Sequence, residues 1–150
     1  MNLLEIRNLK KYFPIQSRLS GVGKQTVKAL DGVSLEIQAG ETFGLVGESG
    51  CGKSTLGHCV LRLLEPTSGE IRLEGQDLLA LKGRALRQLR QHIQIVFQDP
   101  ASSLNPRMTV LQILEEPFRI HSLYPREGYR RKINELLDAV GLDQNSLPKY

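Results

Sequence analysis

One short segment carries a lysine, three glycines and two hydroxyl side chains at a spacing that suits phosphate chemistry. The residues "GESGCGKS", Gly47 to Ser54, fit the pattern G-x-x-x-x-G-K-[ST] at every fixed position. Glycines let a loop curl so that several backbone N–H groups converge on one centre, and a following helix adds partial positive charge there. The segment therefore predicts a loop that holds a nucleoside triphosphate with magnesium.

The side chains of this loop have separate expected roles. Lys53 supplies a mobile ammonium for the β- and γ-phosphates, the Ser54 hydroxyl is a ligand for Mg²⁺, and Thr55 can reach a phosphate oxygen. Cys51 fits as a small permissive residue, since no histidine is placed to make it a catalytic thiol. An ordinary glycine-rich turn between a strand and a helix is the alternative. The expected nucleotide-binding residues of the loop are Gly47, Glu48, Ser49, Gly50, Cys51, Gly52, Lys53, Ser54 and Thr55.

Two residues outside the loop narrow the choice of nucleotide. Tyr12 ends the first expected strand, and its ring can stack on adenine with a gain of about 1 kcal/mol; the alternative is a plain aromatic at a strand end. Gln98 ends a later expected strand, where its amide can ligate magnesium or orient water; the alternative is a solvent-facing polar side chain. A guanine-reading N-K-x-D segment does not occur in the sequence. ATP is therefore favoured over GTP.

The loop needs a strand before it and a helix after it, and the hydrophobic pattern predicts both. The apolar run "TFGLVG", residues 42–47, is typical of a buried strand, and a helical pattern runs from about residue 53 to 64 until Pro66 stops it. Residues 14–28 have the composition of an exposed loop or hairpin excursion. Further strands are expected at 3–7, 33–37, 71–75 and 93–98, and a helix at 83–91.

The last fifty residues have a helical pattern. Helices are expected at 110–118 and 129–142, and the second ends at Gly141. Its apolar face is formed by Tyr129, Ile133, Leu136, Leu137 and Val140. The final stretch "QNSLPKY" is expected to close nothing. The chain therefore predicts an α/β core over residues 1–98, followed by the beginning of a helical subdomain over residues 99–150.

Composition limits the class of protein. The chain has 150 residues, of which 40% are hydrophobic and 24% charged, as in a soluble globular domain. It has neither a signal-peptide pattern nor an apolar segment near the roughly 20 residues that span a bilayer, so a cytoplasmic location is expected. Cys51 and Cys59 are expected to form neither a disulfide nor a zinc site. The net charge is +4, and the arginines at 84, 87 and 90 are interpreted as a solvated face, so no nucleic-acid partner is expected.

At this point the sequence resembles the ATP-binding subunits of ABC transporters. "GESGCGKST" resembles their Walker A motif, "VFQDP" their Q-loop with Gln98, and Tyr12 their A-loop aromatic. "LEPTSGEIRLEGQDL" resembles the segment that lies between these motifs. "FQDPASSLNPRMTV" and the insertion after Tyr12 resemble the oligopeptide and dipeptide importer branch. The resemblance implies an α/β fold of the P-loop NTPase type, an ABC nucleotide-binding domain that is incomplete in these residues.

The resemblance also implies an activity, partners and a location. ATP hydrolysis with Mg²⁺ bound by Ser54 and Gln98 would drive import of a peptide or similar small solute. The partners would be membrane permease subunits, a second ABC ATPase that is a paralogue, and indirectly a solute-binding protein, at the inner face of the membrane. The family's signature motif, Walker B strand, catalytic Glu and switch His do not occur in the 150 residues. We therefore expect an N-terminal fragment that is inactive alone. A soluble ABC ATPase and a non-catalytic nucleotide-binding fragment remain as alternatives.

Overall fold

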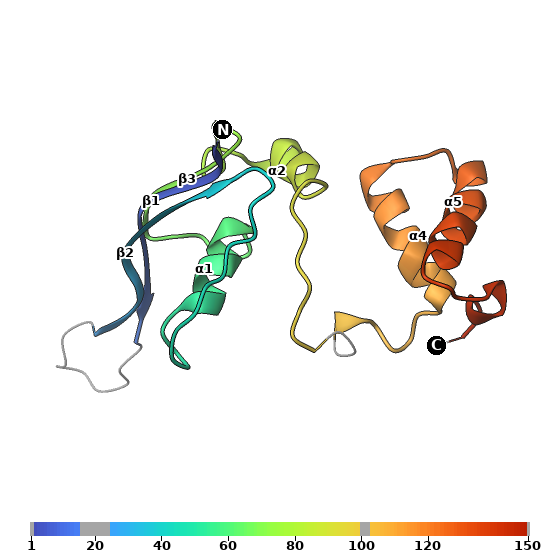
Figure 1. Cartoon of the computed structure of the whole chain (residues 1–150), viewed down its shortest axis with the longest axis horizontal. Helices are drawn as coiled ribbons and strands as arrows, with labels where there is room; N and C mark the ends of the chain where they lie inside the picture. Colours follow the sequence, from blue (N-terminus) through green and yellow to red (C-terminus); the bar gives the residue numbers. More distant parts are fainter. Residues whose placement is uncertain (1, 16–24, 100–102, 150) are drawn as a thin grey trace. The chain divides into compact units, whose positions relative to one another are not determined.

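The computed structural model describes residues 2–15, 25–99 and 103–149. The chain divides into two compact units, residues 1–93 and 94–150, which run from blue to yellow-green and from yellow to red in Figure 1. Each unit has a buried apolar cluster of its own. The separation lies a few residues before the predicted boundary between residues 98 and 99.

The first unit contains an antiparallel sheet with the strand order β2-β1-β3-β4. Its strands are β1 (Asn2–Pro14), β2 (Thr26–Gln38), β3 (Ser68–Leu73) and β4 (Gln76–Asp77). The strands expected near 3–7, 33–37 and 71–75 are present, but β1 and β2 extend much further because they pair along a long hairpin. Of the expected excursion at 14–28, residues 26–28 belong to β2 and residues 16–24 lie outside the described residues.

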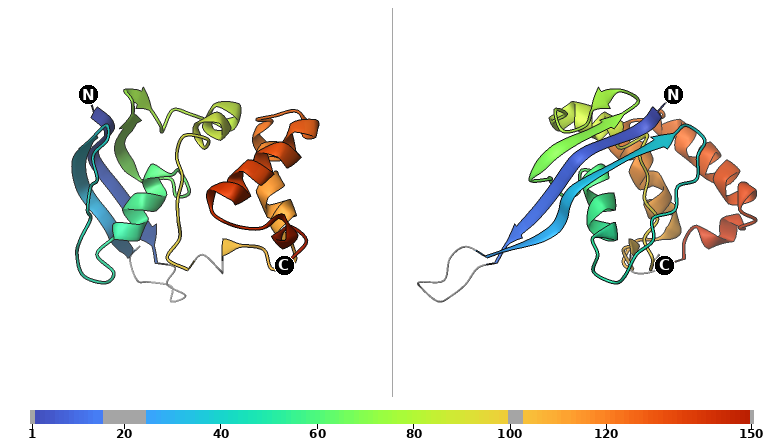
Figure 2. Two further views of the ribbon diagram at one scale, coloured as in Figure 1. Left: turned by 45° about the vertical axis from the view of Figure 1, so that its right-hand side comes forward. Right: turned by 60° about the vertical axis from the view of Figure 1, so that its left-hand side comes forward.

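One face of this sheet is apolar and is covered by helices. α1 (Lys53–Val60) lies against it in both views of Figure 2, and α2 (Gly83–Leu89) adds one buried side chain to the same cluster. Burial of this face follows from the period-two alternation of the strands, since successive side chains point to opposite sides of a sheet. The buried cluster consists of Ile6, Leu9, Leu30, Leu56, Cys59, Ile71, Leu78 and Leu89.

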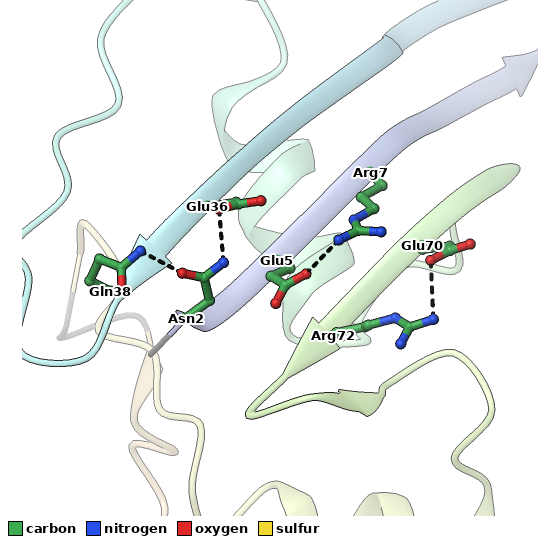
Figure 3. A network of polar contacts seen from close by, with 7 residues as sticks. All are labelled: Asn2, Glu5, Arg7, Glu36, Gln38, Glu70 and Arg72. Carbon is green, nitrogen blue, oxygen red and sulfur yellow. Dashed lines mark hydrogen bonds and ion pairs between the residues drawn. The ribbon is translucent and has the colours of Figure 1, made fainter.

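The opposite face of the sheet is polar, and Figure 3 shows its side chains on β2, β1 and β3. Asn2 donates a hydrogen bond to Glu36 across the hairpin, with Nδ2 and Oε2 2.8 Å apart. Arg7 pairs with Glu5 at 3.0 Å, two residues away on the same face of β1. Exposed pairs of this kind contribute little to stability, at most about 1 kcal/mol each. These exposed polar side chains show that this face of the sheet is in contact with solvent, on the side opposite α1.

α1 is shorter than the expected helix and ends at Val60, several residues before Pro66. Arg62 has a left-handed φ of 53°. Its N–H bonds to the carbonyl of Cys59, while the N–H of Leu63 bonds to that of His58, which is the Schellman pattern of helix ends. A glycine usually occupies this position. Here the strain of an L-residue is offset because the Arg62 side chain, 4% exposed, donates to the carbonyl of Leu78 and to Glu65.

Two of the expected strands are wrong. Neither residues 42–47 nor residues 93–98 form a strand in the part of the chain that the structure describes. Val46 is 90% exposed and Val96 is 88% exposed, and among the described residues neither segment has a partner strand. An apolar run forms a strand only where a neighbouring strand completes its backbone hydrogen bonds. Among the described residues, neither apolar segment pairs with a strand of the sheet, so apolar composition alone did not predict their structure.

The second unit is a pair of helices with a short C-terminal turn. α4 (Val110–His121) and α5 (Arg126–Ala139) match the two expected helices; α4 begins at the expected residue, whereas the other three boundaries differ by three residues each. α4 begins with a capping box, in which Thr109 accepts from the backbone N–H of Gln112 and the Gln112 side chain accepts from the backbone N–H of Thr109. Of the predicted apolar face of α5, only Ile133 and Leu137 are fully buried. Leu136 is 41% exposed and Val140 is 70% exposed.

The expectation that the last residues close nothing is wrong. After the 3₁₀ helix η1 (Gln144–Ser146), Leu147 is 2% exposed and joins the cluster of Phe118, Ile133 and Leu137. The carbonyls of Leu147 and Lys149 accept from the first backbone N–H groups of α4. These N–H groups have no partner inside a helix, so the C-terminal segment satisfies them. Among the described residues, no helix is both long and apolar enough to cross a membrane.

Candidate functional site

The glycine-rich loop lies in the first unit and ends at α1. Gly52 is the N-cap of α1 with φ 98° and ψ 4°, a left-handed conformation that only glycine adopts without strain. Its carbonyl accepts the first helical hydrogen bond, from the N–H of Leu56, at 2.9 Å. Residues 47–51 are exposed. The loop therefore presents its backbone to solvent directly at the positive end of a helix.

Lys53 points back into the loop that precedes it. Its Nζ donates to the carbonyl oxygens of Gly47 at 2.7 Å and Glu48 at 2.6 Å, and lies 3.4 Å from Sγ of Cys51. The side chain comes from the first residue of α1 and is half-buried. The three donors of the ammonium are directed at the two carbonyls and at the Cys51 sulfur, and the thiol is the weakest of these acceptors, so an anion can replace it. The ammonium can therefore hold an anion that enters the loop.

Two hydroxyl residues follow on the first turn of α1. Ser54 is exposed and Thr55 is half-buried, and the first turn contains no acidic residue. The free N–H groups at a helix start attract anions, and an acidic side chain there would compete with them. The loop, Lys53 and these hydroxyls together offer the kind of donors that a phosphate chain requires. A hydroxyl oxygen is also a suitable ligand for Mg²⁺, which prefers oxygen ligands.

The loop is held against β2 at close range. An ideal Cβ built at Gly52 would lie 2.3 Å from the carbonyl oxygen of Ala29 and 3.2 Å from Cδ2 of Leu30. Leu30 is buried in the cluster beneath α1. Lys28, the residue before Ala29 on the same strand, is paired with Tyr12 on β1. The phosphate loop and Tyr12 are therefore both attached to the same few residues of β2.

Tyr12 is held at both its backbone and its hydroxyl. Its N–H donates to Oγ1 of Thr67 at 2.9 Å, and its hydroxyl donates to Oδ1 of Asp31. Asp31 also pairs with Lys28 at 3.1 Å, and the Lys28 ammonium lies over the Tyr12 ring, 5.5 Å from its centroid. The hydrogen bond to Tyr12, followed by that to Lys28, lowers the pKa of Asp31, and the bond to Asp31 raises the pKa of Tyr12.

Asp31 and Lys28 were not identified from the sequence. Both lie on a strand whose expected beginning was residue 33, so nothing in the local pattern placed them opposite Tyr12. The signal that identifies them is the register of the hairpin, in which Tyr12 pairs with Lys28 and Lys10 with Asp31. Register depends on pairing over many residues and on the bulges along β1, which local sequence patterns do not specify.

Gln98 belongs to the second unit, where it is exposed and lies at a bend after the segment that does not form a strand. Its role as a magnesium ligand and nucleotide sensor stays a prediction. The following residues, 100–102, lie outside the described residues. Within the described ranges, no group of three or more His, Cys, Asp or Glu side chains could hold a metal ion.

The two cysteines have different environments and are both free, as the sequence predicts. Cys51 is exposed in the loop beside the Lys53 ammonium. Cys59 is buried on α1, and its desolvation raises the pKa of its thiol. Of the two thiols, only that of Cys51 in the loop is accessible to solvent.

The sequence and structure match one family throughout. The family described as "ABC transporter" matches residues 30–149. The oligopeptide transport ATP-binding protein AppF of Bacillus subtilis is 49% identical over 99% of this chain and 45% of its own length. The dipeptide transport ATP-binding protein DppF of Escherichia coli is 45% identical, over 99% and 44%.

A solved structure supports the same relationship. The ATP-binding cassette MJ0796, described as a dimer in a post-hydrolysis state bound to ADP and Pi, superposes with a TM-score of 0.74 at 27% identity. The match covers 97% of this chain and 60% of that one. The chain thus spans less than half the length of the two curated relatives.

Proposed function

The chain belongs to the ABC transporter family, and on that premise we propose that it is the nucleotide-binding part of an ATPase subunit that drives solute import. The nucleotide is ATP, and the imported solute is a peptide or a similar small molecule. Relatives named for oligopeptide and dipeptide transport at 45–49% identity over almost the whole chain support this branch. The part described here binds the nucleotide.

The observation that carries the proposal is the position of Lys53. Its ammonium lies within the loop on the carbonyls of Gly47 and Glu48, and the loop opens at the start of α1. A nucleotide phosphate that enters the loop would meet backbone N–H groups, the helix start and this ammonium together. An ordinary glycine-rich turn has no need of a lysine that folds back into it. The arrangement favours a triphosphate over a neutral ligand.

The residues of the site have distinct proposed roles. Tyr12 stacks on adenine, the loop from Gly47 to Thr55 holds the phosphates, and Ser54 and Gln98 supply oxygen ligands for Mg²⁺. The metal, when bound, neutralises charge on the phosphates. Catalysis of phosphoryl transfer rests mostly on positioning and charge stabilisation, and these residues supply both. The family's water-activating Glu is not among these 150 residues.

The direct test is ATP binding by the full-length protein with and without the Lys53 ammonium. We expect Lys53→Ala to weaken ATP binding about tenfold to a hundredfold, since charged hydrogen bonds contribute about 1.5–3 kcal/mol. Lys82→Ala is the matched control, because Lys82 is exposed beyond the loop and makes no side-chain cap on α2. Equal ATP affinity in the two variants would contradict the proposed site.

The proposed partners are permease subunits at the inner face of the membrane, a second and paralogous ATPase, and indirectly a solute-binding protein. We propose that the segment from Asp99 to the middle of α4 lies near the permease, with Gln98 coupling it to the nucleotide. Co-expression tests this against the soluble-ATPase alternative. The full-length subunit should sediment with membranes only when the permease is present, whereas a soluble ABC ATPase would stay in the supernatant in both cases.

The second candidate is a non-catalytic nucleotide-binding fragment, and it applies to residues 1–150 taken alone. The absence of the Walker B and signature motifs from the sequence favours it for this polypeptide. We expect the isolated 150 residues to show no ATP turnover. Turnover at the level of the intact subunit, abolished by Lys53→Ala, would exclude this candidate.

A further inference from the structure

Tyr12 has less freedom than an aromatic residue at a strand end normally has. The backbone N–H of Tyr12 donates to Thr67 and its hydroxyl donates to Asp31, so the backbone and the far end of the side chain are both attached to neighbouring segments. A phenol fixed in this way has the position of its ring set by the protein and not by the ligand. A stacking surface that is already ordered avoids part of the entropy cost of binding.

The two faces of the Tyr12 ring are not equivalent. The ammonium of Lys28 lies over one face, 5.5 Å from the ring centroid, within the range of a cation–π contact. Lys28 is kept there by its ion pair with Asp31, at 3.1 Å. Only the other face is left for a planar ligand. Asp31 thus fixes both the orientation of the ring and the side from which a base can approach.

We propose that Asp31 is a positioning residue for adenine, holding the Tyr12 hydroxyl and the Lys28 ammonium so that one ring face is presented to the base. This inference rests on the proposed function, since it takes Tyr12 as the residue that stacks on adenine. Asp31 itself does not contact the nucleotide. Its effect is on the base and not on the phosphates, which are held by the loop around Lys53.

The charge of Asp31 makes a simple affinity measurement ambiguous. Removing a carboxylate near an anion-binding loop attracts any phosphate chain more strongly, whether or not a base is attached. The informative quantity is therefore the ratio of the affinity for ATP to the affinity for inorganic triphosphate, which lacks the base. A purely structural or electrostatic role of Asp31 changes both affinities together and leaves this ratio unchanged.

The experiment measures both affinities in the full-length protein by calorimetry. We expect Asp31→Ala to lower the ATP-to-triphosphate ratio about threefold. Asp31→Asn keeps an oxygen that accepts from the Tyr12 hydroxyl, so it should retain most of the ratio. Glu36→Ala is the matched control, because Glu36 is an exposed carboxylate of the same strand that bonds to Asn2 instead.

A second variant shows whether the effect passes through Tyr12. Tyr12→Phe keeps the stacking ring but removes the hydroxyl, so Asp31→Ala should lower the ratio less in that background, because only the hold on Lys28 is left to lose. An equal fall of the ratio in both backgrounds would overturn the proposal, and so would an unchanged ratio in Asp31→Ala. If Lys53→Ala left triphosphate binding intact, the phosphate site itself would be wrong and the proposed function would fail with it.

Discussion

The carbonyl oxygen of Ala29 lies where a side chain at Gly52 would begin, 2.3 Å from an ideal Cβ at that position. The phosphate loop and strand β2 are therefore in direct backbone contact. This contact fixes the start of α1, and with it Lys53, relative to the strand that pairs with Tyr12. The position of one glycine thus connects the glycine-rich loop to the strand that carries the partner of Tyr12.

Gly52→Ala should damage both the fold and the site. The new Cβ meets backbone that cannot move aside, and φ is 98°, so the loop must shift. We expect the free energy of unfolding to fall by more than about 1 kcal/mol and ATP binding to be lost. Gly57→Ala on α1 is the control. Its Cβ meets nothing within 4 Å, and it should stabilise the helix by about 0.5–1 kcal/mol.

Chemical denaturation and ATP titration of the two glycine variants check this prediction. If Gly52→Ala unfolds at the same denaturant concentration as the wild type and still binds ATP, the contact between the loop and Ala29 is not present in solution.

A bulky maleimide should block ATP binding by reacting with Cys51. Sγ of Cys51 is exposed and lies 3.4 Å from the Lys53 ammonium, so an attached group would occupy the loop. We expect a loss of affinity of at least about tenfold. Cys59 serves as an internal control, because it is buried and its raised pKa keeps it protonated. Mass spectrometry should find one modification in the folded chain.

Cys51→Ala should bind ATP nearly as well as the wild type and resist the reagent. Complete modification of Cys51 with unchanged ATP affinity would show that the thiol does not lie in the phosphate site.

The group formed by Tyr12, Asp31 and Lys28 should give a stability contribution that depends on pH. The pKa of Asp31 is lowered, so its contribution is present above its unfolded pKa and is lost as pH falls through the folded value. The pKa values of Tyr12 and Lys28 are raised, so their contributions are present below their unfolded values and are lost as pH rises through the folded ones. The window of stabilisation is about pH 5 to 9.

Denaturation of the wild type and Asp31→Ala across pH checks the sign. The difference in stability should be largest inside the window and should shrink at acidic and alkaline pH. The absorbance of tyrosinate gives a second measurement, since Asp31→Ala should let Tyr12 ionise at lower pH than in the wild type. Tyr12→Phe identifies which of the four tyrosines is responsible. A pH-independent difference would mean that the three side chains do not interact.

Leu147 should be important for the second unit although it lies in a stretch with little sequence pattern. It is 2% exposed and contacts the core of α4 and α5. Leu147→Ala should lower the free energy of unfolding by about 2–5 kcal/mol, as for other buried leucines. Leu142→Ala is the control, because Leu142 is 49% exposed. Equal melting temperatures of the two variants would contradict the packing of the C-terminal segment.

Patterns that depend on neighbours in the chain predicted much of this protein. The spacing from Gly47 to Ser54 predicted the loop and the helix after it, and the period of apolar residues predicted α4 and α5. These features depend on residues three or four positions apart, whose interactions are set by helix geometry alone. The same local information gave the apolar character of residues 42–47 and 93–98 but not their pairing.

The sequence by itself determined the chemistry of the phosphate loop, because that chemistry lies in eight consecutive residues. Only the tertiary structure decided which side chains contact Tyr12, because the register of the β1–β2 hairpin places Asp31 within hydrogen-bond distance of its hydroxyl. It also decided that Arg62, and not Pro66, ends α1, because a buried guanidinium offsets the strain of a left-handed residue. Both results depend on contacts between segments far apart in the chain, and no local pattern contains them.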